Sequence, residues 1–121
     1  MAANGIKREV LVRAGSIAVR ARLLDTPVAD RIWQALPIYA AADRQEGRVA
    51  FPVLLQGSVP AEDAPLAHGA FAVDAERSTI LIAWRPATSA RAHVWALALD
   101  DVAPLAGLRN GDRLALLEAD S

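Results

Sequence analysis

The residues best suited to chemistry in this sequence are aromatic and basic side chains at the ends of short apolar runs. Trp84 and Arg85 end one such run and precede Pro86. A tryptophan ring offers a stacking surface, and an arginine offers paired N–H donors to an anion. His93 and Trp95 share one side of a later run. We take Trp84, Arg85, His93 and Trp95 as candidate ligand-binding residues, against the simpler alternatives of core tryptophans and a hydrogen-bonded histidine.

Other kinds of chemistry lack the residues that they need. The chain has no cysteine, which excludes thiolate nucleophiles, disulfides and cysteine-ligated metals. His68 and His93 are its two histidines, and neither has a second histidine at metal-binding spacing. There is no G-x-S-x-G elbow and no glycine-rich phosphate loop. We therefore expect no metal and no cofactor, and hydrolase and kinase activities have no support.

Composition limits the class of protein. The 121 residues are 54% apolar with a formal net charge of −1, which predicts one folded domain over residues 1–121. Such a charge supplies no field to attract nucleic acid or an anionic membrane, whereas it permits a homodimer. No apolar run approaches the roughly 18 residues of a membrane span. The first residues do not resemble a signal peptide, so we expect a cytoplasmic protein.

Period-two alternation predicts that strands dominate the fold. Runs at 6–13 and 16–24, separated by Ala14-Gly15, predict a β-hairpin. The one clear helix is predicted over about residues 27–36, because Thr26 is a good N-cap and Pro27 suits the first helical position. Pro37 disfavours helical geometry in the residue before it and ends the helix.

The second half of the chain continues the strand pattern. Further strands are predicted at 49–53, 70–73, 78–84, 91–100 and 112–118, with a helical turn near residues 101–106. Strict alternation in the run 91–100 puts Ala92, Val94, Ala96 and Ala98 on one face and His93, Trp95, Leu97 and Leu99 on the other. Seven or eight short strands and one helix predict a mainly β fold, either a barrel or a half-open sandwich.

Three stretches carry a resemblance to a known group of proteins. They are "LDTPVA" with "IWQALPI" and then "GRVAF" between residues 24 and 51, "TILIAWRPAT" at 79–88, and "DDVAPLAGLRNGDRLALLEA" at 100–119. In order and spacing they resemble the small bacterial and archaeal cyclophilin-like proteins of unassigned function. The resemblance implies a closed antiparallel cyclophilin-type β-barrel with a short helix at its end. The chain departs from the pattern at 45–48 and 68–71, where the family has tryptophan-containing passages.

The resemblance also implies a candidate isomerase site. Cyclophilins place an arginine before a phenylalanine and a glutamine shortly after it, and Arg48, Phe51 and Gln56 occupy similar positions here. An arginine donor near the prolyl nitrogen weakens the amide resonance that sets the barrier to rotation. Under the simpler alternative, Arg48 is a solvated strand residue and Phe51 fills the core, with Leu54 and Leu55 typical of a buried strand.

Several functions therefore remain open. The leading hypothesis is a non-catalytic barrel that binds a small molecule or a proline-containing peptide. The alternatives are a weak peptidyl-prolyl cis-trans isomerase and a structural or assembly module that uses an exposed strand edge. A further alternative is a peptide binder of the PDZ type, because "GLRNGD" at 107–112 is similar to a passage of those modules, although their carboxylate-binding loop is absent.

Overall fold

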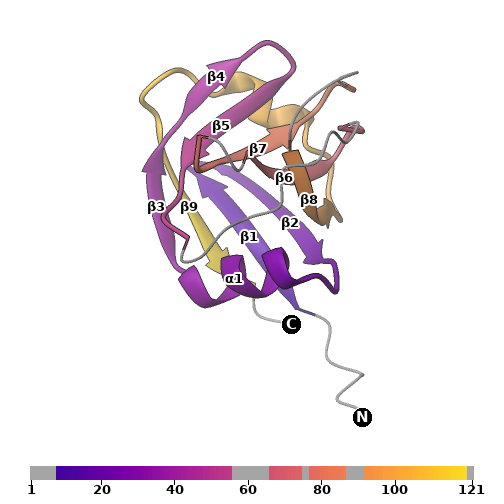
Figure 1. The fold of residues 1–121 in the computed structure, drawn as a ribbon. Helices are drawn as coiled ribbons and strands as arrows, with labels where there is room; N and C mark the ends of the chain where they lie inside the picture. The colour runs from indigo at the N-terminus through magenta and orange to yellow at the C-terminus, as the bar shows by residue number, and fades with distance from the viewer. Residues whose placement is uncertain (1–7, 56–65, 75–76, 87–91, 120–121) are drawn as a thin grey trace.

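Strands are the main secondary structure of the protein, as the alternation predicts. A computed structural model describes residues 8–55, 66–74, 77–86 and 92–119. Within these ranges lie one α-helix, one 3-10 turn and nine strands (Figure 1). In chain order they are β1 (Glu9–Ala14), β2 (Ile17–Leu23), α1 (Pro27–Ala35), β3 (Ile38–Ala41), β4 (Asp43–Gln45), β5 (Arg48–Pro52), β6 (Ala70–Asp74), β7 (Thr79–Ala83), β8 (Ala92–Ala98), η1 (Ala103–Gly107) and β9 (Arg113–Glu118).

The predicted hairpin and helix are confirmed. β1 and β2 pair antiparallel around Gly15, whose φ of +59° suits glycine at a tight turn. The helix α1 begins after Thr26, whose side-chain oxygen accepts a hydrogen bond from the backbone N–H of Ala29 at 3.1 Å. It ends at Ala35, because the backbone of Leu36, before the proline, is extended.

All the strands join one antiparallel sheet, in the order β3-β9-β1-β2-β8-β6-β7-β5-β4. The two end strands, β3 and β4, are consecutive along the chain and are separated by Ala42 alone. The sheet therefore curls until its ends meet at that residue (Figure 1). Its hydrogen-bonded ladder is open nevertheless, so the closed barrel that the resemblance implied is not what these pairings form. The ladder does not close because β4 pairs with β5, whereas β3, just before β4 in the chain, pairs with β9.

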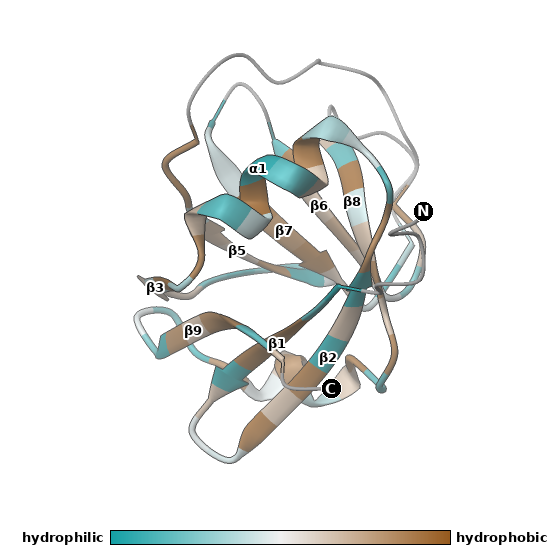
Figure 2. Cartoon of the chain, turned by 90° about the horizontal axis from the view of Figure 1, so that it is seen from below, coloured by the Kyte–Doolittle hydropathy of each residue, from teal (hydrophilic) through white to brown (hydrophobic). Residues whose placement is uncertain are grey.

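The main core fills the inside of the curled sheet. Viewed from below, β9, β1 and β2 lie opposite β5, β7, β6 and β8, and α1 crosses the near end (Figure 2). Ile32 of α1 is buried in this core from one end, and Leu105 of η1 belongs to the same core. The rings of Phe71 and Trp95 meet edge to face at its centre, with centroids 5.7 Å apart. A smaller alanine-rich cluster is buried on the other face of the sheet, around Leu66.

A β-bulge in β8 corrects the predicted faces of that strand. Phe71 of β6 opposes Ala96, whereas the next residue, Ala72, opposes Val94, so Trp95 is the extra residue. Ala92 belongs to the smaller cluster with Val94 packed against it, but Ala96 joins the main core. Strict alternation placed all three on one face. It fails here because the inserted residue shifts the order of the side chains.

Candidate functional site

The structure places Arg48 and Phe51 on opposite faces of β5. Arg48 is half-buried, and its Nε donates to Oε1 of Gln45 across the β4–β5 ladder at 2.7 Å. Phe51 is fully buried in the main core. Residues an odd number apart in a strand point to opposite faces, so the two side chains do not share a pocket. Gln56 lies outside the described residues.

Trp84 and Arg85 lie beside the β4–β5 turn. Their backbone N–H groups both donate to the carbonyl of Gly47, at 3.0 and 3.1 Å. The ring of Trp84 is half-buried against the core, and the guanidinium of Arg44 lies 5.7 Å from its centroid. The stacking surface expected of Trp84 is thus already used by a cation of the protein. The side chain of Arg85 is exposed.

His68 is also near Trp84, a contact that the sequence did not indicate. Its Nδ1 lies 2.7 Å from the backbone oxygen of Trp84. A carbonyl oxygen only accepts, so Nδ1 carries the proton in this contact. Its Nε2 lies 3.8 Å from Oδ1 of Asp101. His68 is exposed, and the contact joins its loop to the residue that follows β7.

His93 and Trp95 belong to a different region. His93 is half-buried and pairs in register with Val73, which pairs with Ile80, which in turn pairs with Phe51. Phe51 lies four positions after Gly47, which is bonded to Trp84, so at about 3.3 Å per position this row lies about 13 Å along the strands from Trp84. Trp95 is fully buried, and its Nε1 has no hydrogen-bond partner among the described residues. His93 is thus far from Trp84 and Arg85, and Trp95 is enclosed in the core, so the four candidate ligand-binding residues do not form one accessible site.

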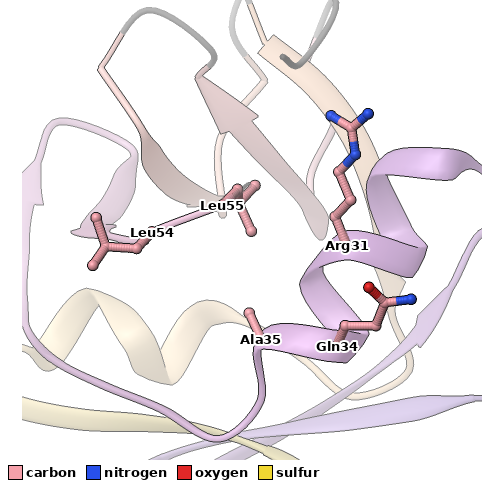
Figure 3. A pocket seen from close by; sticks show the side chains of 5 residues that line it. All are labelled: Arg31, Gln34, Ala35, Leu54 and Leu55. Atoms are coloured by element: carbon pink, nitrogen blue, oxygen red, sulfur yellow. The ribbon is translucent and has the colours of Figure 1, made fainter. Parts of the chain in front are cut away.

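A groove lies between α1 and the segment after β5 (Figure 3). Its lining residues are Arg31, Gln34 and Ala35 from α1, and Leu54 and Leu55 from the segment. Its volume of about 440 Å³ falls in the usual range for small-molecule sites. Arg31 and Gln34 supply polar groups along the helix, and the leucines supply an apolar wall. Both leucines were expected in a buried strand, yet Leu54 is 93% exposed.

The sequence did not single out this groove, for a physical reason. Arg31 and Gln34 are spaced by three residues, which is typical of the solvated face of an amphipathic helix. Leu54 and Leu55 follow Pro52, and pairing of β5 with β7 ends at that proline. A chain that leaves its sheet at a proline is the one local signal that these leucines are not ordinary strand residues.

A second hollow, of about 390 Å³, lies beside the β1–β2 turn. It is lined by Gly15, Gly107, Asp112 and Arg113 among others. The carboxylate of Asp112 already accepts the backbone N–H of Arg109 at 2.8 Å and so closes its own loop. Ile17 and Leu108 also line the hollow, but Leu108 is buried whereas Leu54 of the groove is exposed, which makes the hollow the poorer candidate.

The one carboxyl group with a perturbed pKa among the described residues is remote from the groove. Asp100, just after β8, accepts hydrogen bonds from both the side chain and the backbone N–H of Arg20 on β2. These bonds lower the pKa of Asp100, the side-chain bond most. The pair joins two strands at the surface. The described ranges hold no group of three acidic or histidine side chains that could bind a metal ion, and no helix in them is long and apolar enough to cross a membrane.

Comparison with known proteins establishes the fold and leaves the function open. No protein-family profile matches the chain, and no curated protein matches it. The solution structure of a hypothetical protein from Archaeoglobus fulgidus is similar to it, with a TM-score of 0.77 at 19% sequence identity. The alignment covers 98% of this chain and 100% of that one. A likeness at this identity shows a shared architecture and carries no activity with it.

Proposed function

We propose that the protein is a non-catalytic binding domain whose groove beside α1 holds a small amphipathic carboxylate or the end of a peptide. The observation that carries the proposal is the lining of the groove, in which Arg31 and Gln34 lie along one side and Leu54 and Leu55 along the other (Figure 3). Ligand sites commonly combine an apolar wall with a few polar groups that fix orientation.

The polar side of the groove favours an anionic ligand. A guanidinium has five N–H donors in a planar fork that matches a carboxylate, and Arg31 brings this cationic group to the lining of the groove. The side-chain amide of Gln34, one turn along the helix, can donate to a second oxygen or accept an N–H. The leucines select an apolar group next to the anion, as in a molecule that ends in an aliphatic side chain and a carboxylate.

The experiment that tests this proposal measures binding of N-acetyl-leucyl-leucine, which ends in an aliphatic side chain and a carboxylate, and of its C-terminal amide. Arg31→Met keeps much of the apolar stem and removes the charge, while Arg13→Met makes the same change on the exposed face of β1. The carboxylate probe should bind about tenfold more weakly to Arg31→Met, which corresponds to about 1.4 kcal/mol. The amide probe should not distinguish the variants. Equal binding of the carboxylate probe to both variants would contradict the proposal.

The isomerase alternative has its own test. Arg48 and Phe51 point to opposite faces of β5, which argues against a shared isomerase site, and neither residue lines the groove. Exchange NMR on a proline-containing tetrapeptide should show the same cis–trans rate with and without substoichiometric protein. A rate that rises with the wild type and falls back with Arg48→Ala would reinstate the enzyme.

The proposal retains the wider expectations from the sequence. Membership of the cyclophilin-like group stays a proposal, which the curled antiparallel sheet with a helix across one end supports, although the open ladder departs from the closed barrel of that group. A near-neutral charge supports a ligand other than nucleic acid. The cytoplasm remains the proposed location.

A further inference from the structure

We infer that the protein forms a symmetric dimer through an exposed apolar patch on the outer face of the sheet, where β3 lies beside β5. This seam patch is defined by Tyr39 and Ala41 of β3, Pro52 of β5 and Leu54 just after it. The inference goes beyond the proposed function, which uses Leu54 alone of these residues, and its partner is a second copy of this chain.

The seam patch holds the most exposed large apolar side chains of the described residues. Leu54 is 93% exposed and Tyr39 is 73% exposed, against 49% for Leu97, the next in order. The other two residues of the patch are exposed as well, and the residues that alternate with them belong to or pack against the main core. All four therefore point outward. Adjoining exposed apolar side chains of this kind are typical of an interaction surface.

The patch is continuous across the seam between the two strands. Cα atoms of β3 and β5 lie within 8 Å of one another, although no ladder joins these strands in the described part of the chain. The β4–β5 register, extended two residues past Asp43↔Ala50, sets Ala41 beside Pro52. A strand inserted here would need two spacings of about 4.8 Å, so the seam has no room for one. A partner must cover the patch from outside, side chain against side chain.

Two charged side chains border the patch, and neither has an ion pair among the described residues. Arg113 of β9 is in register with Ala41, and its side chain is exposed. Asp43 of β4 is exposed on the same face, because the residue between it and Ala41 is buried in the core. Its carboxylate accepts one hydrogen bond, from Nε2 of Gln45 at 3.0 Å. A cation and an anion on one surface allow that surface to be complementary to itself.

The arrangement of these groups around Ala41 fits a twofold axis. Arg113 lies about 5 Å to one side across the ladder, and Asp43 lies about 7 Å along the strand. An axis in the plane of the contact, through Ala41 and along the diagonal between these directions, exchanges the two. Arg113 of each copy then meets Asp43 of the other copy. The same axis exchanges the positions of Pro52 and Tyr39 on the opposite sides of Ala41, so these two residues also pack against each other between the copies.

A second copy fits this surface better than other partners do. The net charge of −1 gives little repulsion between copies. Beside Ala41 the patch has one cation and one anion, so it offers no excess charge to a nucleic acid or an anionic membrane. Only a few residues of each copy take part, which predicts a weak, reversible dimer rather than an obligate one.

Sedimentation velocity over a concentration series measures the dimer. The wild type should show a reversible equilibrium between monomer and dimer. Tyr39→Ser should raise the dissociation constant at least about tenfold, because it removes the largest side chain of the patch. Leu97→Ser is the matched control, since it makes a similar change at an exposed residue of β8, in the middle of the sheet, and should leave the dissociation constant unchanged.

Charge reversal tests the twofold arrangement. Arg113→Asp and Asp43→Arg should each weaken the dimer, because each variant sets like charges against one another in both symmetric contacts. The double variant exchanges the two charges and should regain the wild-type dissociation constant. Arg31→Met, in the groove, should leave sedimentation unchanged, so the dimer and the groove are tested separately.

Three results would overturn the inference. A wild type that remains monomeric up to about 1 mM would show that the patch does not bind a second copy. A dimer that Tyr39→Ser leaves as tight as the wild type would place the contact elsewhere. A double charge variant that associates more weakly than either single variant would contradict the pairing of Arg113 with Asp43.

Discussion

Replacing Phe51 by alanine should destabilise the protein far more than replacing Arg48, three residues away on the same strand. Phe51 is fully buried in the main core, and its loss should cost about 3–5 kcal/mol through lost transfer energy and the cavity left behind. Arg48 is half-buried, and its Nε donates a hydrogen bond to Gln45 on the neighbouring strand. Its replacement should cost less than about 1 kcal/mol, the usual worth of one such hydrogen bond.

Urea unfolding followed by tryptophan fluorescence measures both changes. With a slope of about 2 kcal/mol per molar urea, Phe51→Ala should lower the midpoint by about 2 M and Arg48→Ala by less than about 0.5 M. If Phe51→Ala does not fold, Phe51→Leu retains most of the volume and should cost about 1–1.5 kcal/mol. A midpoint that falls as far for Arg48→Ala as for Phe51→Ala would refute the assignment of the two residues to opposite faces.

Three further predictions concern local features of the fold. Thr26→Ala should lose about 1 kcal/mol of unfolding free energy because the cap on Ala29 disappears, and Thr26→Ser should restore most of it, both by urea unfolding. Gly47→Ala should lower the melting temperature, since φ there is +75° and the added Cβ would lie 3.0 Å from Cβ of Arg85; Gly107→Ala, with nothing within 4 Å, is the control and should leave it unchanged. The lowered pKa of Asp100 means that its pair with Arg20 stabilises the fold above the unfolded pKa of about 3.9 and ceases to do so as the pH falls through the folded value. The urea midpoint of Asp100→Asn should accordingly change less than that of the wild type on acidification, and a parallel fall in both would contradict the role of the pair.

Local patterns were sufficient to predict the elements of the fold. The hairpin around Gly15 and the helix after Thr26 follow from turn chemistry, capping and alternation, which act within a few residues. The bulge at Trp95 was not predictable in this way, since it is a mismatch in length between β8 and β6. The division at Ala42 is likewise set by a distant partner, because β3 pairs with β9, which begins 72 positions after β3 ends.

The candidate site depended on the same non-local information. Arg48 and Phe51 looked like one constellation because they are close in sequence, yet a strand separates side chains at odd spacing. His93 and Phe51 looked unrelated, yet β6 and β7 place them in one row. The groove residues carried no conspicuous motif, because a solvated helix face and two leucines after a proline become a site only when α1 is placed against the end of β5.

The most direct test of the binding groove is a two-dimensional amide NMR titration with N-acetyl-leucyl-leucine. The account predicts that the largest shifts concentrate on residues 31–35 and 53–55, that they saturate, and that they diminish in Arg31→Met but not in Arg13→Met. Shifts that gather instead around Trp84 and Arg85, or around the β1–β2 turn, would contradict the assignment of the site to the groove beside α1.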